Sequence, residues 1–480
     1  MISSEINSRD NSSIHFEILG KYKGYVFIYK NISRDHYLVK YDDSMRIVET
    51  IQLDFIPEKV FNLDFISYPN KFHVIYQYQR NNIVYCNAVK LTPDGIKSGE
   101  ILLLDTTKVG YFADNKIYST TFSEDKKRIL VYKQNIRNGT ITIASKVFDD
   151  ELFLQDSARQ VFDYDDRSEL YSGLSIDNEG NLVYAKSTEI ARGKDGVLDI
   201  FMRKHKVDSL FIRQIPLTKK YSEDVFIKAD NINKRFVLCA FCYTSRKRYL
   251  DGLFSASFSV DNINAVNTAY NRFSDSLRNP NNADYKYSFD YANLAIKNLI
   301  LKKNGGFIVL SEDYYNENIA MGNGWNRGMF NTMPFFNMQD YYLFNQYYGY
   351  MPFNNTGFNQ SIRYYSNDIV VANIDSALNL SWNTIIRKKQ LDVDNQNFLS
   401  YSTLNAGSEL RFFFLERDRT RQTISSQGLF PDGELRRYPT IKGTDSRYEF
   451  MPRLAKQVGS ATIIVPFLYL GKIGFAKIEY

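Results

Sequence analysis

The chain has 480 residues, of which 44% are hydrophobic and 24% charged, an ordinary composition for a globular protein that excludes wholesale disorder. The formal net charge of +6 is mild for this length and does not predict nucleic-acid binding, which usually requires a concentrated basic face. The aromatic content is high, with 36 Tyr, 35 Phe and 2 Trp.

The N-terminal stretch, MISSEINSRDNSS, is polar and lacks the apolar core of a signal peptide. Nowhere does the sequence contain the roughly 18 consecutive apolar residues of a transmembrane helix. The sequence is therefore expected to have no transmembrane segment, and to be either cytoplasmic or the mature form of an exported protein.

One pattern recurs along the chain: a strand, a polar turn and a strongly apolar strand. The plainest copy is FSEDKKRILVYK at 122–133. The apolar strands begin at Tyr25, Phe72, Ile129, Leu182, Phe236, Phe307, Leu410 and Ala461. Most successive starts are close to 50 residues apart, and the longest interval contains a compositionally odd segment described below.

Further strands follow the apolar strand in each repeat, for example HYLVKYD at 36–42 and VETIQL at 48–53. Alternating patterns, β-branched and aromatic residues and short polar turns are hairpin signals. About four strands in ~50 residues are typical of a β-propeller blade. We therefore predict an all-β fold, a single propeller domain over 1–480 with eight four-stranded blades, or seven if the loose first copy is not a full blade.

The last repeat offers three clear strands, within MPRLAKQV, ATIIVPFL and IGFAKIEY. A fourth strand would have to come from elsewhere in the chain. The segment before Tyr25 is the natural donor, because such an exchange pairs open strand edges and closes the ring.

Few residues suggest chemistry. Cys239 and Cys242 form a CxxC within the apolar run RFVLCAFCYTS, where strand side chains three apart point to opposite faces. They are expected to be buried and not to share a ligand. The four His lack metal-ligand spacing, and the acidic run at 163–169 is expected to be a solvated turn. We find no catalytic motif and predict no catalytic, cofactor-binding or metal-binding residues, and hence no enzyme.

An insertion at 312–362 interrupts one blade. Its central part, 321–360, contains 12 aromatic residues, 8 Asn, 5 Met and 5 Gly, with Arg327 and Asp340 as its charges. Long loops of this kind are often functional, and Met and aromatic residues are frequent at interfaces. Three alternatives stay open: a self-packed cap, a partner-docking or pore-blocking element, and a disordered loop. The candidate anchors are Trp325, Phe330, Phe335, Phe336, Tyr341, Tyr342, Phe344, Tyr347 and Tyr348.

The copy FSEDKKRILVYK resembles the TolB-like and WD40-like propeller repeats of bacterial envelope proteins. The segment YYSNDIVVANIDSALNLSW at 364–382 and the tail GKIGFAKIEY are similar to blades of uncharacterised exported propellers from bacteria that use type IX secretion. No Trp-Asp dipeptide or Gly-His pair recurs, so the WD40 pattern itself is not reproduced.

The resemblance implies a periplasmic or outer-membrane-associated location and a protein partner such as an outer-membrane secretion or motility complex. We accordingly expect a non-catalytic protein–protein interaction scaffold or accessory subunit. The alternative is a glycan-binding or glycan-cleaving propeller with aromatic platforms and axial carboxylates. A convergent carboxylate pair in the central channel would favour that alternative.

Overall fold

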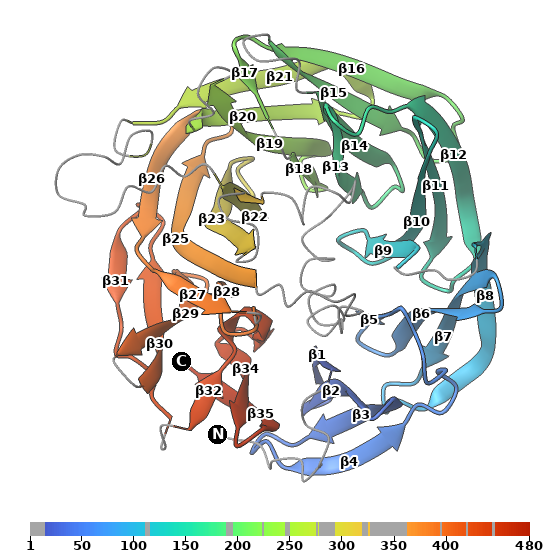
Figure 1. Cartoon of the computed structure of the whole chain (residues 1–480), viewed down its shortest axis with the longest axis vertical. Helices are drawn as coiled ribbons and strands as arrows, with labels where there is room; N and C mark the ends of the chain where they lie inside the picture. The colour runs from blue at the N-terminus through green and yellow to red at the C-terminus, as the bar shows by residue number, and fades with distance from the viewer. Residues whose placement is uncertain are drawn as a thin grey trace.

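The chain folds into a ring of eight antiparallel sheets that follow one another in chain order (Figure 1). The computed structural model describes residues 15–110, 116–188, 195–222, 225–244, 250–274, 277, 293–318, 325–326, 362–393, 396–418, 421–443 and 447–480. In blades one to four the first strand lies near the central axis and the later strands lie toward the rim (Figure 1). The predicted all-β, eight-bladed propeller is therefore confirmed.

Blades one to four each have four strands in simple sequential order. Blade one comprises β1 (His15–Tyr22), β2 (Tyr25–Ile32), β3 (Asp35–Tyr41) and β4 (Ile47–Gln52). Blade two comprises β5 (Asn62–Ser67), β6 (Phe72–Arg80), β7 (Ile83–Leu91) and β8 (Lys97–Lys108). Blade three comprises β9 (Tyr118–Phe122), β10 (Arg128–Arg137), β11 (Thr140–Asp149) and β12 (Leu154–Asp163). Blade four comprises β13 (Glu169–Ile176), β14 (Leu182–Thr188), β15 (Gly196–Arg203) and β16 (Leu210–Leu217).

Blades five to eight depart from this plan in small ways. Blade five has β17 (Lys220–Tyr221) and β18 (Phe226–Asp230) side by side on β19 (Arg235–Thr244), followed by β20 (Leu250–Ser259) and β21 (Asn262–Arg272). Blade six comprises β22 (Leu294–Leu301), β23 (Phe307–Asn318), β24 (Trp325–Asn326), β25 (Ile362–Ile374), β26 (Leu380–Ile386) and β27 (Gln390–Val393). Blade seven comprises β28 (Tyr401–Asn405), β29 (Leu410–Asp418), β30 (Arg421–Leu429) and β31 (Leu435–Arg437). Blade eight comprises β32 (Tyr448–Phe450), the 3-10 turn η2 (Pro452–Leu454), β33 (Lys456–Gly459), β34 (Thr462–Tyr469) and β35 (Lys472–Glu479).

The apolar strands predicted from the repeat are the second strands of the eight blades. Each predicted start falls within one residue of the first residue of β2, β6, β10, β14, β19, β23, β29 or β34. These strands have a neighbour on both edges and another blade on each face. Such strands read as continuous apolar runs because both of their faces are buried.

The core is divided into apolar clusters that lie between consecutive blades. On β19, Cys239 packs with Phe307 and Val309 of blade six, whereas Cys242 packs with Val183 and other residues of blade four. The two thiols are fully buried on opposite faces of the sheet, as predicted. Burial raises the pKa of each thiol to about 12, so neither is a reactive thiolate at neutral pH.

The prediction that the segment before Tyr25 completes blade eight is wrong for the residues that can be described. β1 pairs with β2 of its own blade, and residues 1–14 lie outside the described residues. Of the predicted strand MPRLAKQV, Pro452–Leu454 form η2 and the strand β33 begins at Lys456. β32, which precedes this segment, and β33 pair with different halves of one edge of β34, and β35 pairs with its other edge. Among the described residues, blade eight is built from strands of its own stretch of the chain.

The seam between blades one and eight is closed by side-chain packing. The rings of Phe16 and Phe475 meet edge to face with centroids 5.2 Å apart, and Ile18, Met451 and Ile464 belong to the same buried cluster. At the rim of this cluster the Lys477 ammonium lies 3.2 Å from the Asp43 carboxylate. The ring therefore closes through apolar contact and one ion pair across the described part of the seam.

The seam also buries a cation. Lys30 of β2 is 1% exposed, and its Nζ donates to the hydroxyl of Tyr41 at 2.5 Å. The ammonium lies 5.1 Å from the ring centroids of Tyr41 and Phe475. Burial lowers the pKa of Lys30 to about 7, because the apolar surroundings penalise the charged form.

Candidate functional site

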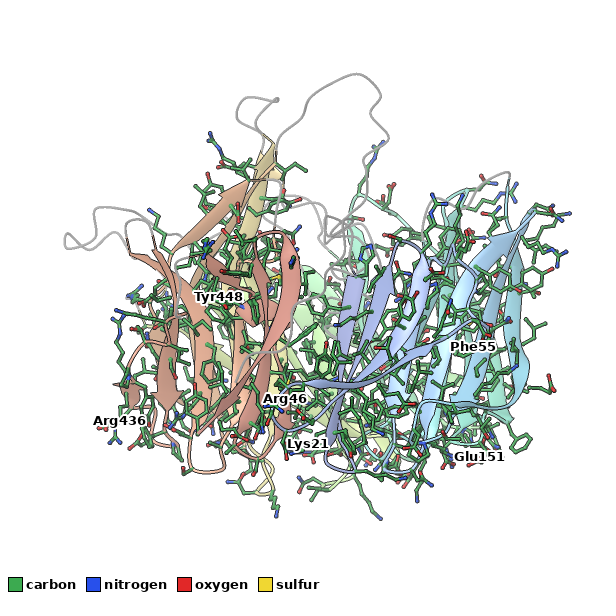
Figure 2. All side chains as sticks on the ribbon, turned by 90° about the horizontal axis from the view of Figure 1, so that it is seen from below. Lys21, Arg46, Phe55, Glu151, Arg436 and Tyr448 are labelled. Carbon is green, nitrogen blue, oxygen red and sulfur yellow. The ribbon has the colours of Figure 1, made fainter. Side chains whose placement is uncertain are left out.

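Blade six carries a hairpin that extends beyond the ring. β23 and β25 stay paired from Phe307 with Ile374 as far as Asn318 with Ile362, and in Figure 2 these strands rise above the neighbouring blades. β26 pairs with the half of β25 inside the ring, and β27 pairs with the extended half. Residues 312–318, which the sequence assigned to the insertion, are therefore strand.

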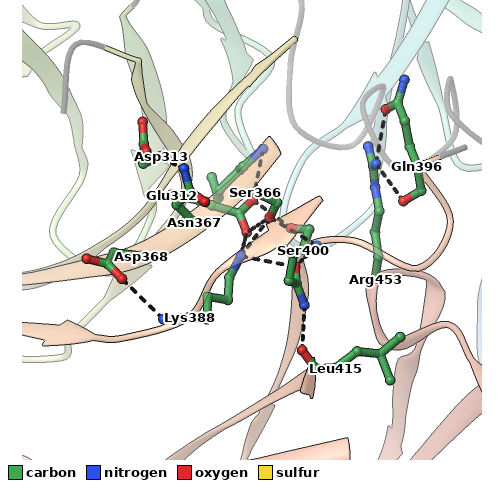
Figure 3. A network of polar contacts seen from close by, with 12 residues as sticks. Glu312, Asp313, Ser366, Asn367, Asp368, Lys388, Gln396, Ser400, Leu415 and Arg453 are labelled. Atoms are coloured by element: carbon green, nitrogen blue, oxygen red, sulfur yellow. Dashed lines mark hydrogen bonds and ion pairs between the residues drawn. The ribbon is translucent and has the colours of Figure 1, made fainter. Parts of the chain in front are cut away.

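A buried ion pair lies where this hairpin leaves the ring. The Glu312 carboxylate lies 2.6 Å from Nζ of Lys388, and both side chains are 0% exposed. The hydroxyls of Ser366 and Ser400 donate to the two Glu312 oxygens at 2.6 and 2.7 Å, and Lys297 Nζ lies 3.5 Å from Oε2. Figure 3 shows Glu312, Ser366, Lys388 and Ser400 converging. We call these five residues the Glu312 network.

Gln390 connects the Glu312 network to blade seven. Its Oε1 accepts hydrogen bonds from Lys388 Nζ at 3.2 Å and from the Ser400 backbone N–H at 2.7 Å. Its Nε2 donates to the carbonyl of Leu415 on β29 at 3.0 Å. Both charges of the ion pair therefore have several hydrogen-bonding partners, which a buried pair needs in order to offset its desolvation cost.

The electrostatics favour the ionised form of Glu312. Burial by itself would raise the pKa of this carboxyl. The ammonium groups of Lys388 and Lys297, with the hydrogen bonds from Lys388 and Ser366, outweigh burial and lower the pKa of Glu312 to about 2. The Glu312 carboxylate is consequently ionised at physiological pH.

Polar contacts also surround the place on β25 where its pairing changes from β27 to β26. Asn367 Nδ2 donates to the Asp313 carboxylate at 3.0 Å. The Asp368 carboxylate accepts from Arg387 Nη1 at 2.5 Å and from the Lys388 backbone N–H at 3.1 Å. The pairing of β23 with β25 shifts register at this level, between Glu312 and Tyr314, and such bulges re-aim a strand.

Two further blades brace the base of the hairpin. The Tyr314 hydroxyl donates to Oε1 of Gln396 at 2.7 Å, and Arg453 Nη1 from η2 of blade eight donates to the same oxygen at 3.1 Å. On the hairpin itself the rings of Tyr315 and Tyr365 stack with centroids 4.6 Å apart. The hairpin is thus an ordered part of the ring and is tied to blades seven and eight.

A cavity of about 460 Å³ lies among the inner strands. Residues of β9, β13, β18, β22 and β28 line it, so it faces the axis from blades three to seven. Its lining includes Phe122, Ser175, Phe226, Asn298 and Thr403, together with the charged residues Glu124, Lys228 and Lys297. Lys297 belongs to both the cavity wall and the Glu312 network.

The predicted partner-binding residues fall almost wholly outside the described residues. For Trp325 the backbone is described: it forms β24 and pairs with Glu317 of β23. Phe330, Phe335, Phe336, Tyr341, Tyr342, Phe344, Tyr347 and Tyr348 lie outside the described residues. The structure does describe the two strands, β23 and β25, that flank residues 319–361 in the sequence.

The other sequence candidates are dispersed. Within the acidic run at 163–169, Asp165 accepts hydrogen bonds from the Arg167 N–H and the Ser168 hydroxyl in a turn. His36 lies 2.6 Å from the Tyr29 hydroxyl, and His73 is fully buried. In the part of the chain that the structure describes, no group of three or more His, Cys, Asp or Glu is placed to hold a metal ion. No helix there has the length and apolar character needed to cross a membrane.

Sequence reasoning missed the Glu312 network. Lys388 lies in IRKKQ at 386–390, a short basic run that reads as solvated surface. One signal could have indicated burial: Glu312 follows the apolar run FIVLS without an intervening turn residue, and a charged residue at the end of a central strand needs a partner. The partner itself is 76 positions away and could not be identified from spacing.

Similarity to known proteins lies in the fold. No protein-family model and no curated protein matches the chain. Prolyl oligopeptidase B from Galerina marginata is 8% identical with a TM-score of 0.41, and the match covers 95% of this chain and 55% of that chain. Oligopeptidase B from Leishmania major is 7% identical with a TM-score of 0.38, over 97% and 54% of the two chains. This chain therefore spans about half the length of those oligopeptidases.

The β-propeller domain of the Trilobed protease from Pyrococcus furiosus is 10% identical with a TM-score of 0.35. In that comparison the match covers 88% of this chain and 97% of the other. That the protein is a β-propeller follows from its own ring of eight sheets. At these identities the similarity concerns the fold and carries no information about activity.

Proposed function

We propose that the protein is a non-catalytic interaction scaffold in which the ring supports the blade-six hairpin as a docking element. The observation that carries this proposal is the buried Glu312–Lys388 pair at the base of the hairpin. The proposed setting, an accessory subunit of an outer-membrane secretion or motility assembly in a bacterial envelope, rests on the resemblance of the repeats.

Support for a docking role comes from what the buried Glu312–Lys388 pair contributes to stability and to geometry. Apolar residues of similar size would often stabilise a core as well as a buried ion pair does, so the pair gives little net stability. It does fix geometry, because Glu312 accepts hydrogen bonds only while β23, β25 and the segment before β28 keep their relative positions. A binding element held in one geometry loses less entropy when its partner docks.

The cavity offers a second line of support. A glycan-cleaving propeller would be expected to present two carboxylates several ångströms apart near the axis. Among the described residues that line the cavity, Glu124 is the one carboxylate, and it accepts a hydrogen bond from Asn231 at 2.9 Å. The cavity therefore favours the scaffold over a cleaving site in blades three to seven. On the first strands of blades one and two, burial and the nearby Asp64 charge raise the pKa of Glu17 to about 8.

The strand register of the hairpin shows where residues can be deleted without disturbing the pairing of β23 with β25. Because Asn318 pairs directly with Ile362, residues 319–361 can be replaced by an Asn-Gly turn, the preferred two-residue hairpin closure. We expect the ring to unfold at an unchanged temperature, because no described cluster depends on the removed residues. Proteins cross-linked to the wild-type chain in native membranes should fall at least about tenfold in yield, the effect of losing about 1.4 kcal/mol of binding.

A matched control separates docking from general surface change. Substitution of Ile232 with serine alters an exposed apolar residue in a turn of blade five and should leave the cross-linked set intact. Recovery of the same partners, in the same yield, from the deletion variant would contradict the proposal.

A further inference from the structure

The axial cavity has the dimensions of a ligand site. Its volume of about 460 Å³ lies within the roughly 300–1,000 Å³ that is usual for small-molecule pockets. It is bounded by the first strands of five consecutive blades, each of which has a strand neighbour on one edge among the described sheets. These edges direct backbone N–H and C=O groups toward the axis.

The charged groups of the wall are already engaged. Lys228 Nζ donates to the carbonyl of Leu299 at 2.7 Å, and Glu124 accepts from the Asn231 amide at 2.9 Å. Lys297 is directed to Glu312 at 3.5 Å. A strongly charged ligand would have to displace one of these contacts, and so the wall disfavours ligands with a net charge.

The remaining polar groups are neutral and of both hydrogen-bonding types. Asn298 of β22 is exposed within the lining, while Ser175 of β13 and Thr403 of β28 are partly exposed across the same space. Amides and hydroxyls both donate and accept. A ligand complementary to this wall carries several hydroxyl groups that can do the same.

Apolar contact comes from flat side chains. Phe122 of β9 and Phe226 of β18 are partly buried and line the cavity, and Tyr401 of β28 joins them. Aromatic walls with a few orienting polar groups are typical of small-molecule pockets. The C–H faces of a sugar ring fit such surfaces while its hydroxyls reach the neutral polar groups.

We propose that the axial cavity binds a neutral saccharide of one or two rings. Among the described residues that line the cavity, none lies in 319–361, so this inference goes beyond the proposed scaffold function and does not depend on it. A failure to bind sugar would not contradict the proposed scaffold function. Loss of the scaffold function would not contradict sugar binding.

Calorimetric titration of the full chain with maltose, cellobiose, lactose and chitobiose, and with glucuronic acid as an anionic probe, tests the proposal. At least one neutral disaccharide should bind with a Kd of about 10 μM to 1 mM. The variant Asn298→Trp, which fills the cavity from an exposed position, should abolish that binding. The matched variant Asn267→Trp, at an exposed position of the outer strand β21, should bind as the wild type does.

A milder variant keeps the test decisive if Asn298→Trp does not fold. Asn298→Ala should weaken binding by about tenfold, the effect of one lost hydrogen bond. The proposal is overturned if none of the four disaccharides binds, if binding survives Asn298→Trp and Asn298→Ala unchanged, or if glucuronic acid alone binds.

Discussion

Replacing Glu312 with glutamine is expected to lower the free energy of unfolding by about 3–5 kcal/mol, because it leaves the buried Lys388 ammonium without its countercharge. Both side chains are fully buried, so solvent cannot compensate. Urea unfolding at neutral pH, followed by circular dichroism, measures the difference. We also expect the backbone amides of the hairpin to exchange hydrogen faster in this variant, since Ser366 and Ser400 donate to the same carboxylate.

The pH dependence of this effect has a definite sign. The pKa of Glu312 is lowered in the folded protein to about 2 from 4.5, so the carboxylate stabilises the fold fully above the unfolded pKa. This stabilisation is lost as the pH falls from about 4.5 toward 2. The difference in the free energy of unfolding between the wild type and Glu312→Gln should therefore become smaller as the pH falls through this range and stay constant at higher pH.

Two control variants test whether the loss of stability in Glu312→Gln comes from the buried ion pair. Glu100→Gln changes an exposed carboxylate on β8 and should alter stability by less than about 0.5 kcal/mol. The double variant Glu312→Leu with Lys388→Met should recover most of the lost stability, because apolar pairs can replace buried ion pairs. A Glu312→Gln protein as stable as the wild type would show that the pair does not brace the hairpin.

Replacing Lys30 with methionine is expected to stabilise the protein by a few kcal/mol at pH 6. The substitution removes a charge that lies among apolar and aromatic groups at the seam of blades one and eight, and each unit of pKa shift corresponds to about 1.4 kcal/mol. Because burial lowers the folded pKa of Lys30 to about 7 from 10.5, the unfolded chain binds more protons between these values. Wild-type stability should rise over that interval, and the advantage of the variant should shrink.

Unfolding midpoints at pH 6, 8 and 10 measure this trend. Lys97→Met, which removes an exposed lysine on β8, serves as the matched control and should show no such dependence. A Lys30→Met protein that is less stable than the wild type at pH 6 would mean that the Tyr41 hydrogen bond outweighs the burial of the charge.

Much of the fold could be predicted from local sequence pattern. The second strand of each blade is apolar on both faces, and so its start could be located to within one residue at Tyr25, Phe72 and the six later positions. The side-chain period of a strand likewise sufficed to place Cys239 and Cys242 on opposite faces. Both features depend only on neighbouring residues, which a sequence displays directly.

The features that were missed depend on residues far apart in the chain. Lys388 has the appearance of a surface lysine until the fold brings it against Glu312. The strand predicted in MPRLAKQV was placed wrongly, because Pro452–Leu454 form η2 and the edge of β34 is shared by β32, which precedes this segment, and β33, which ends it. The cavity collects residues from five blades, and no local pattern identifies which side chains face the axis.

Hydrogen–deuterium exchange of the wild-type chain tests most directly whether the blade-six hairpin is a fixed part of the ring. Peptides covering 312–318 and 362–366 should exchange as slowly as those covering β29, and Glu312→Gln should accelerate exchange in these peptides selectively. Exchange of 312–318 and 362–366 in the wild type at the rate of an unprotected peptide would contradict the account.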